Sequence, residues 1–200
     1  MLQPGAAFHV PPYENSYLQT LKRVPTEQLK IAYSLESPVG TPVSEDAKRA
    51  VKKVLQLLEG KGHVIEEVTP HIDGVDLMKN YYLMNSGEMA SVVDQLERGL
   101  QRPVQPDEIE LETWMLAHAG EHVSAKEYAQ SLGAWDKAAI EMARLHETYD
   151  YYITPTTAFT APKIGELSHT EASEEKWRER MLSTDDPAKK QQYIYEMFEP

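Results

Sequence analysis

Leu29-Lys-Ile-Ala-Tyr-Ser34 alternates apolar and polar side chains as a half-buried β-strand does, and His63-Val-Ile-Glu-Glu-Val68 is a second β-rich run. Between them Ser44 is placed to cap a helix whose first turn holds Glu45 and Asp46, where the helix dipole favours anions. Apolar residues then recur at helical spacing: Ala47, Ala50, Val51, Val54, Leu57 and Leu58. Strand, helix and strand in this order predict a βαβ unit with parallel strands and a right-handed connection.

A third strand is predicted in Tyr149-Asp-Tyr-Tyr-Ile-Thr-Pro-Thr-Thr-Ala-Phe-Thr-Ala-Pro162. Its aromatic and β-branched start is stopped by Pro155, and small hydroxyl residues follow. We expect this strand to lie parallel to the first, which gives a sheet of order 2-1-3. Ligands of such sheets bind beyond the carboxyl ends of the strands, so the pattern predicts that Thr154, Thr156 and Thr157 line a substrate pocket.

The chain divides into four parts around these strands. Residues 1–28 carry four prolines and few apolar repeats, so we expect an extended arm with a short helical turn near 16–22. Residues 29–70 hold the βαβ unit, 71–148 are helical, and 149–200 contain the third strand, the pocket loop and two C-terminal helices. The expected fold is one α/β domain with about three mostly parallel strands and a helical layer.

The helical part of the chain contains residue patterns that mark where helices begin and end. Helices are expected over 73–100, over 108–119 and, opened by the capping box Ser124-Ala-Lys-Glu127, over 124–148. The residues of the third helix predicted to face inward are Leu132, Trp135, Ala139, Met142 and Leu145. The last helix of the chain is expected to be capped by Thr184.

The composition limits the classes of function. Hydrophobic residues make up 41% of the chain, and no stretch approaches the roughly 20 apolar residues that a membrane span needs. The net charge of -12 argues against a nucleic-acid partner, which requires a cationic surface. The absence of cysteine excludes disulfides, thiolate catalysis and cysteine-based zinc sites, and is typical of a reducing compartment. We therefore expect a cytoplasmic protein without a nucleic-acid or membrane partner.

Two short motifs match known catalytic patterns. His118-Ala-Gly-Glu-His122 has the spacing of a zinc-peptidase motif, but that chemistry requires one continuous helix, and Gly120 interrupts it. We expect a turn with two surface histidines there, and no metal or cofactor. Ser173-Glu-Glu-Lys176 matches the serine–lysine motif of penicillin-interacting enzymes. Its acidic surroundings indicate an exposed helix start, with Ser173 as the N-cap.

Glu88 is an unusual residue within Met84-Asn-Ser-Gly-Glu-Met-Ala-Ser91. A carboxylate on the apolar side of a helix either pairs with a partner or faces a cavity, and the ion pair is the commoner outcome. If the side chain faces a cavity, Glu88 and the nearby Asn85 would lie beside a bound substrate. Asn85 and Glu88 therefore join the candidate pocket residues.

Several segments, in their order and spacing, resemble the amidase signature family of serine hydrolases. The two strands with their helix resemble the βαβ unit that follows the family's signature region, and Asn80-Tyr-Tyr-Leu-Met-Asn-Ser-Gly-Glu-Met-Ala90 resembles its next helix. Asp107-Glu-Ile-Glu-Leu-Glu-Thr-Trp114, Val123-Ser-Ala-Lys-Glu-Tyr128 and the third strand are similar to one branch, the 6-aminohexanoate-cyclic-dimer hydrolases and their relatives. The resemblance runs from about residue 11 to residue 200.

The resemblance implies amide cleavage by machinery that these segments do not include. Members of the family use a serine nucleophile, a second serine in a cis peptide linkage and a lysine base, and a Gly/Ser-rich loop forms the oxyanion hole. All of these lie upstream of the region resembled, and the 200 residues contain no adjacent pair of serines. The resemblance thus implies a C-terminal part of an amidase, truncated at both ends, with no catalytic residue to assign.

The leading hypothesis is the C-terminal portion of an amidase-family hydrolase of C–N bonds, inactive alone, whose partners are a small amide substrate and the missing N-terminal catalytic part. The alternative is a non-catalytic binding or interaction module on the same scaffold. Because the family's sheet is large and mixed, a fragment with about three strands leaves an unpaired edge and uncovered apolar surface. We therefore also expect self-association or marginal stability of the chain alone.

Overall fold

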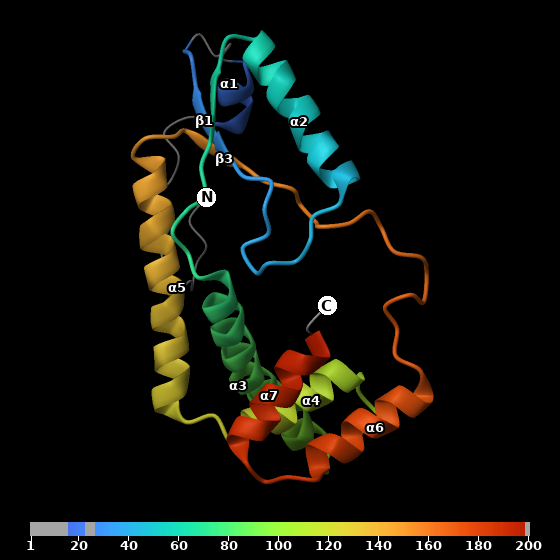
Figure 1. Ribbon diagram of the computed structural model, residues 1–200. Helices are drawn as coiled ribbons and strands as arrows, with labels where there is room; N and C mark the ends of the chain where they lie inside the picture. Colours follow the sequence, from blue (N-terminus) through green and yellow to red (C-terminus); the bar gives the residue numbers. More distant parts are fainter. Residues whose placement is uncertain (1–15, 23–26, 199–200) are drawn as a thin grey trace.

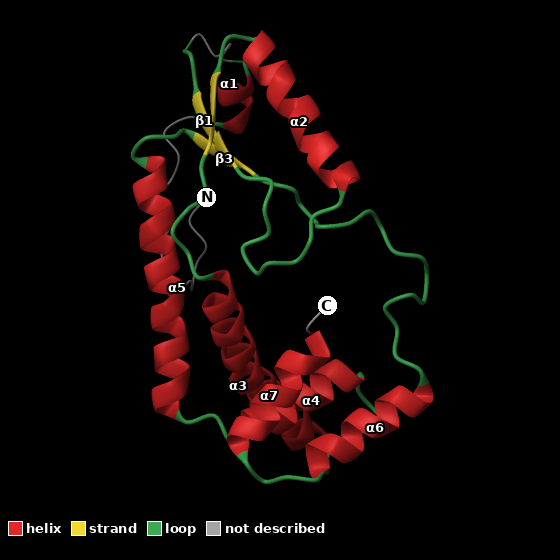
Figure 2. Cartoon of the chain, in the orientation of Figure 1, coloured by secondary structure: helices red, strands yellow, loops and turns green. Residues whose placement is uncertain are grey.

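The computed structural model describes residues 16–22 and 27–198, with a small sheet at one end of the molecule and a helical layer at the other (Figure 1). The elements are α1 (Tyr17–Leu21), β1 (Lys30–Tyr33), α2 (Glu45–Gly60), β2 (Val64–Glu67), α3 (Gly74–Leu100), α4 (Leu111–Gly120), α5 (Ala125–His146), β3 (Tyr151–Ile153), α6 (Glu171–Leu182) and α7 (Pro187–Phe198). Figure 2 shows the strands together near α2, and α3, α4, α6 and α7 clustered away from them. Residues 1–15 of the predicted arm lie outside the described residues, and α1 is the short helix expected near 16–22.

The three strands form one parallel sheet in the order β2-β1-β3, which confirms the predicted order 2-1-3. In this sheet Ile31 of β1 lies opposite Ile65 of β2 on one side and Tyr151 of β3 on the other. Two more bonds extend the second pairing: the Lys30 N–H donates to the Asp150 carboxylate, and the Asp150 N–H donates to the Lys30 carbonyl, both at 2.8 Å. The central strand is thereby fixed from both neighbours.

Helix α2 packs through a narrower apolar face than its sequence predicts. Its N-cap is Ser44 as expected, since the Ser44 side chain accepts a hydrogen bond from the backbone of the first turn. Val51 and Leu55 are buried, whereas Val54 and Leu57 are 46% and 61% exposed. The helical period is correct, but a sheet of three short strands covers only one row of side chains along the helix.

The main hydrophobic core lies in the helical layer. Its buried members are Leu111, Trp114, Met115 and Ala119 of α4, Met181 of α6 and Ile194 of α7. Met115, Met181 and Ile194 have no exposed surface. Tyr82 of α3 borders the cluster and stacks on Phe198 of α7 with 4.8 Å between ring centroids. The core therefore joins four helices that are separated along the chain.

Helices α3 and α4 approach each other closely where Gly120 lies against Ser86. A Cβ atom on Gly120 would overlap the backbone carbonyl of Ser86 and crowd the side chain of Ala90. Ser86 is fully buried, and its hydroxyl donates to the Tyr82 carbonyl at 2.8 Å, so this polar side chain is satisfied inside the contact. Glycine is the residue that this approach requires.

Helix α5 begins where the sequence predicts, but its inward face is largely unburied. The capping box is present, because the Ser124 side chain accepts from the Glu127 N–H and the Glu127 carboxylate accepts from the Ser124 N–H. Of the predicted inward residues, Leu145 is buried, while Leu132 and Trp135 are 43% and 39% exposed. Helix α3 covers this side of α5 only in part, through contacts such as the ring pair of Tyr81 and Trp135.

The predicted caps of the last two helices are wrong. Helix α6 starts earlier than expected, and its N-cap is Thr170, whose side chain accepts from the Ser173 N–H at 3.2 Å. Ser173 is therefore inside the first turn. At the start of α7 the Asp186 carboxylate, rather than Thr184, accepts from the first-turn N–H of Ala188 at 3.0 Å. In both places the residue directly before the helix, Thr170 for α6 and Asp186 for α7, supplies the capping side chain.

The chain exposes more surface than a self-contained protein of its size. Its accessible area is 14819 Å² for a mass of 22.7 kDa, against about 9,500 Å² expected from the scaling of folded monomers. Large apolar side chains contribute, among them Leu57, Ile140 and Phe159, which are 61%, 53% and 53% exposed. The two outer strands of the sheet, β2 and β3, pair on one side only within the described part of the chain.

We expect the purified chain to self-associate at micromolar concentration, because its exposed apolar area and strand edges are free to pair with another copy. Multi-angle light scattering at neutral pH should therefore give a mass above 22.7 kDa. A monodisperse monomer with a cooperative thermal transition above roughly 60 °C would contradict this expectation.

Candidate substrate cleft

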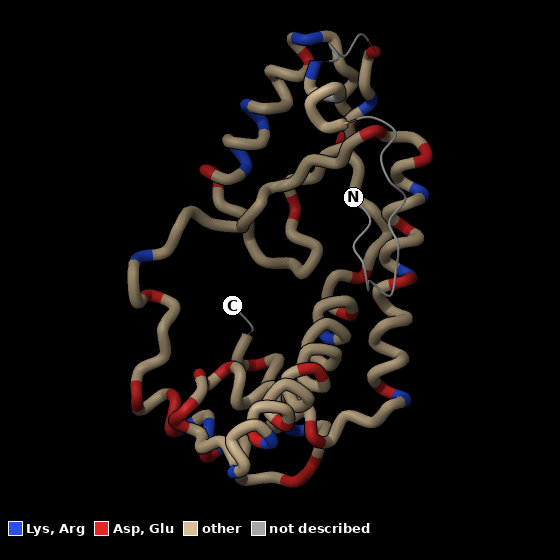
Figure 3. Tube along the Cα trace, turned by 180° about the vertical axis from the view of Figure 1, so that it is seen from behind, with Lys and Arg blue, Asp and Glu red and all other residues tan. Residues whose placement is uncertain are grey.

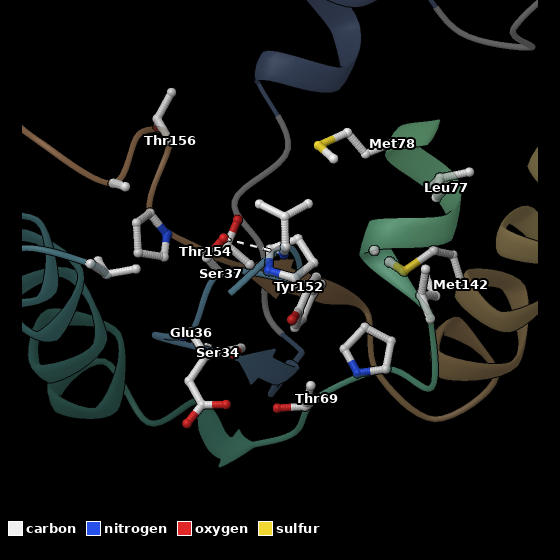
Figure 4. Close-up of a pocket in the computed structure, with 18 of the residues that line it drawn as sticks. Ser34, Glu36, Ser37, Thr69, Leu77, Met78, Met142, Tyr152, Thr154 and Thr156 are labelled. Atoms are coloured by element: carbon white, nitrogen blue, oxygen red, sulfur yellow. Dashed lines mark hydrogen bonds between the residues drawn. The ribbon is translucent and has the colours of Figure 1, made fainter. Parts of the chain in front are cut away.

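A cleft of about 730 Å³ lies where the carboxyl ends of the three strands meet α3 and α5 (Figure 4). Its volume falls within the range of small-molecule sites, about 300–1,000 Å³. The lining comes from the strand ends, from the loop between β1 and α2, and from one side of each of the two helices. In parallel sheets this edge is the usual place for a ligand, because the loops that follow successive strands converge there.

Hydroxyl groups form the wall of the cleft on the side of the sheet. Ser34 follows β1, Thr69 follows β2, and Tyr152 and Thr154 come from β3 and its end. Ser34 is 3% exposed, and its Oγ accepts from the Glu36 N–H at 3.2 Å. Burial raises the pKa of Tyr152, while a hydrogen bond with Ser34 acts in the opposite direction, so the phenol stays neutral. This wall offers neutral donors and acceptors.

Apolar and sulfur-containing side chains form the opposite wall. Leu77 and Met78 come from the start of α3, and Met142 comes from the end of α5. Tyr81 and Trp135 link the two helices, with their rings edge to face and 5.9 Å between centroids. Such a ring pair contributes about 0.5–1.5 kcal/mol beyond the area that it buries, so it helps to fix the width of the cleft.

Two close contacts hold the loops at the rim of the cleft. Gly74 opens α3 directly against the loop after β1, and a Cβ atom there would overlap the carbonyl of Pro38. The Ser44 N–H donates to the Ala158 carbonyl at 2.8 Å and so joins the loop after β3 to the start of α2. The rim is thus tied to the sheet layer and to α3 by backbone contacts.

The structure brings the three predicted threonines to this cleft. Thr154, Thr156 and Thr157 all contribute to its lining, at the carboxyl end of β3. The Thr157 hydroxyl is engaged within its own loop, because it donates to the Phe159 carbonyl at 2.8 Å. Their position follows from the strand end at Pro155, as the sequence pattern indicates.

The two predicted residues of α3 lie elsewhere. Glu88 borders a separate open groove between α3 and the start of α5, where it accepts a hydrogen bond from the Tyr128 hydroxyl at 3.2 Å. Desolvation and the Glu88 charge raise the pKa of Tyr128. Asn85 contributes neither to the cleft nor to this groove. Both residues are more than one helical turn beyond Tyr81, so the helix axis carries them away from the sheet.

Several lining residues escape sequence reasoning. Trp135 and Met142 are predicted from helical spacing to be core residues, and they line the cleft instead. Ser34 and Thr69 follow the ends of the first two strands, and the rule that selects Thr154 would also have selected them. The signal was therefore present for the hydroxyl wall, whereas nothing local distinguishes a helix face that packs from one that lines a cavity.

The lining suits binding of a neutral molecule more than catalysis. Glu36 is the only charged residue among the lining residues, which include no lysine, arginine or histidine. The cleft thus offers Ser34 no lysine or histidine, the bases that most often activate a serine nucleophile. The carbonyl and N–H of an amide could bond to the hydroxyl wall while its hydrocarbon part lies on the apolar wall.

The arrangement at His118 and His122 does not favour a metal site. Helix α4 ends at Gly120 between them, and the Nε2 atoms of both rings face the Nζ atom of Lys190 at 3.2 and 2.9 Å. The ammonium group occupies the position that a metal ion would need. No group of three or more metal-ligating side chains occurs within the described residues. The prediction of two surface histidines is correct for His122, which is exposed. It is wrong for His118, whose side chain is only 23% exposed.

The described helices carry charges of both signs and no membrane-spanning segment. Lys and Arg are interspersed with Asp and Glu along the helices (Figure 3). None of the described helices combines the length and the apolar character that a transmembrane segment requires. The expectation of no nucleic-acid partner stays a prediction that rests on the net charge of -12.

Comparison with known proteins relates most of the chain to amidases. A profile of the family described as Amidase matches residues 7–188. A lipoamidase of Enterococcus faecalis is 37% identical over 190 residues, which cover 90% of this chain and 25% of that protein. Two solved structures of 6-aminohexanoate cyclic dimer hydrolase, one complexed with substrate, share the fold with a TM-score of 0.73 and 20% identity, covering 94% of this chain and 41% of theirs. The chain therefore spans well under half of the length of these relatives.

Proposed function

Because this chain belongs to the amidase family, we propose that it forms the substrate-cleft part of a hydrolase of C–N amide bonds. In this proposal the serine nucleophile, the second serine and the lysine base come from polypeptide outside these 200 residues. The observation that carries the proposal is the cleft at the carboxyl ends of β1, β2 and β3, with hydroxyl groups on one wall and apolar side chains on the other. Alone, the chain is then expected to be inactive.

The proposed partner is the catalytic part of the amidase. This chain covers 25% of the lipoamidase and 41% of the cyclic dimer hydrolase, so the relatives contain a large further portion. The accessible area of 14819 Å² exceeds that of a folded monomer of this mass by on the order of 5,000 Å². A second portion that packs over the cleft and the exposed apolar faces would bury such an excess.

The lining of the cleft favours a small neutral amide as substrate. The side chains of Leu77, Met78 and Met142 suit a hydrocarbon chain, and the carboxylate of Glu36 disfavours an anionic one. The names of the relatives, a lipoamidase and a hydrolase of 6-aminohexanoate cyclic dimer, support amide cleavage as the reaction. The particular amide is a property of the complete enzyme.

A chimeric enzyme tests the proposal. The corresponding quarter of the Enterococcus faecalis lipoamidase is replaced by this chain, and hydrolysis of lipoamide is followed by release of the product amine or ammonia. We expect turnover by the chimera, and no turnover above the buffer rate by this chain alone or by the lipoamidase without the segment. Hydrolysis by the purified chain alone would overturn the proposed division between cleft and catalytic part.

The second candidate function is a non-catalytic module that binds amides. The observation that favours it is the absence of a lysine or histidine base among the residues that line the cleft. Calorimetric titration of this chain with hexanamide distinguishes the two. A folded but inactive chimera, together with micromolar binding of the amide by the chain alone, would select the binding module.

A further inference from the structure

Lys190 is the one charged side chain that is buried among the described residues, at 2% exposure. It lies in the first turn of α7, and its Nζ atom contacts the Nε2 atoms of His118 and His122 at 3.2 and 2.9 Å. None of the ion pairs of the described residues includes Lys190. A buried cation without a carboxylate depends on its hydrogen-bond acceptors, which here are two imidazole rings.

The chemistry of the contact fixes the protonation of both rings. An ammonium group has three donors and no acceptor, so each Nε2 atom must accept, and each ring is neutral with its proton on Nδ1. The Nδ1 atom of His118 lies 3.9 Å from the Glu121 carboxylate, which agrees with that tautomer. Burial and then the Lys190 charge lower the pKa of His118, His122 adds to this shift, and Glu121 and Asp185 oppose it.

The same contact attaches α7 to the rest of the helical layer. Lys190 places its charge near the C-terminal end of α4, where the helix dipole favours a cation. The ring of His118 stacks on Trp114 with 5.2 Å between centroids, and Ile194, one turn along α7, is fully buried in the core. A proton on either imidazole would remove one acceptor and place a second positive charge at about the distance of a hydrogen bond from the ammonium.

We propose that Lys190, His118 and His122 form an acid-sensitive latch, which holds α7 on α4 near neutral pH and releases it when an imidazole is protonated. The direction of this pH dependence follows from the linkage between protonation and folding. The folded chain favours neutral His118, so its pKa is lower there than in the unfolded chain, where histidine titrates near about 6.5. The stabilisation is complete above that pH and is lost as the pH falls below it.

Hydrogen–deuterium exchange of the full chain at about pH 7.5 and about pH 5.5 tests the latch. After correction for the chemical exchange rate, protection of α7 is expected to fall about tenfold relative to α2 at the lower pH. In the double variant His118→Gln, His122→Gln each amide oxygen still accepts from the ammonium but cannot titrate, so protection of α7 should change by less than about twofold. His71→Gln, which replaces an exposed histidine outside the contact, should behave like the parent chain.

Equal protection of α7 at the two pH values in the parent chain would overturn the proposal, and so would the same loss in the double variant. If the double variant does not fold, ¹⁵N NMR of the histidine rings in the parent chain gives an independent answer. Near pH 7.5 both rings should carry their proton on Nδ1. A proton on Nε2 of both rings would exclude the donor–acceptor contact with Lys190 and overturn the latch.

Discussion

Replacing Gly120 with alanine is expected to lower the free energy of unfolding by about 3 kcal/mol. The added Cβ would overlap the carbonyl oxygen of Ser86, which is part of the backbone of α3 and cannot rotate away as a side chain would. The alternative is a shift of α4, and that shift would disturb Trp114 and Met115 in the core. Denaturant unfolding followed by tryptophan fluorescence measures the difference.

The matched control is the same substitution at Gly133. This glycine lies within α5, and a Cβ atom there would meet nothing within 4 Å. Alanine has the higher helix propensity and fewer unfolded conformations, so Gly133→Ala should stabilise the chain by about 0.5–1 kcal/mol. The two changes thus have opposite expected signs. Equal stability of the two variants would show that α3 and α4 do not approach as closely as described.

Replacing Trp135 with alanine in the chimeric enzyme is expected to lower kcat/KM for lipoamide on the order of tenfold, mainly through a higher KM. The indole forms part of the apolar wall and is the edge-to-face partner of Tyr81. Its loss removes apolar surface that a substrate would cover and also loosens the spacing of α3 and α5. Steady-state kinetics with lipoamide gives both constants.

Leu132→Ala is the control on the same helix. Leu132 is 43% exposed, close to the 39% of Trp135, but it does not line the cleft. The change should alter kcat/KM by less than about twofold, since an exposed position away from the site has small effects. A similar loss of kcat/KM in both variants would mean that α5 affects activity only through the stability of the fold. No loss in either variant would place substrate binding outside this cleft.

The sheet could be predicted from the sequence because its signals are local. Strand alternation near Ile31, the amphipathic helix after Ser44 and the stop at Pro155 each depend on neighbouring residues, and the right-handed crossover rule then leaves few arrangements. The capping box of Ser124 is local in the same way. The N-cap prediction at Ser173 was wrong because Thr170, another residue type that caps helices, lies three residues earlier, directly before the first residue of α6.

The cleft walls and the latch could not be predicted because each depends on contacts between residues that are distant in sequence. Helical spacing shows that Trp135 lies on an apolar face, but not whether that face packs or lines a cavity. Lys190 belongs to a Lys-Lys pair on a polar helix, a pattern typical of an exposed surface, and its burial depends on two histidines about 70 residues earlier. Glu88 is a similar case, since its partner Tyr128 is 40 residues away.

The central place of β1 affects how the chain can fold during synthesis. Its first neighbour, β2, leaves the ribosome soon after it, whereas the hydrogen bond from Lys30 to Asp150 closes a loop of 120 residues. Helices α3, α4 and α5 are translated in that interval. Translation proceeds at 5–20 residues per second, so synthesis of this interval takes on the order of ten seconds. During that time one edge of β1 has no strand partner. For that time the nascent chain displays a strand edge that a chaperone or a neighbouring nascent chain could bind.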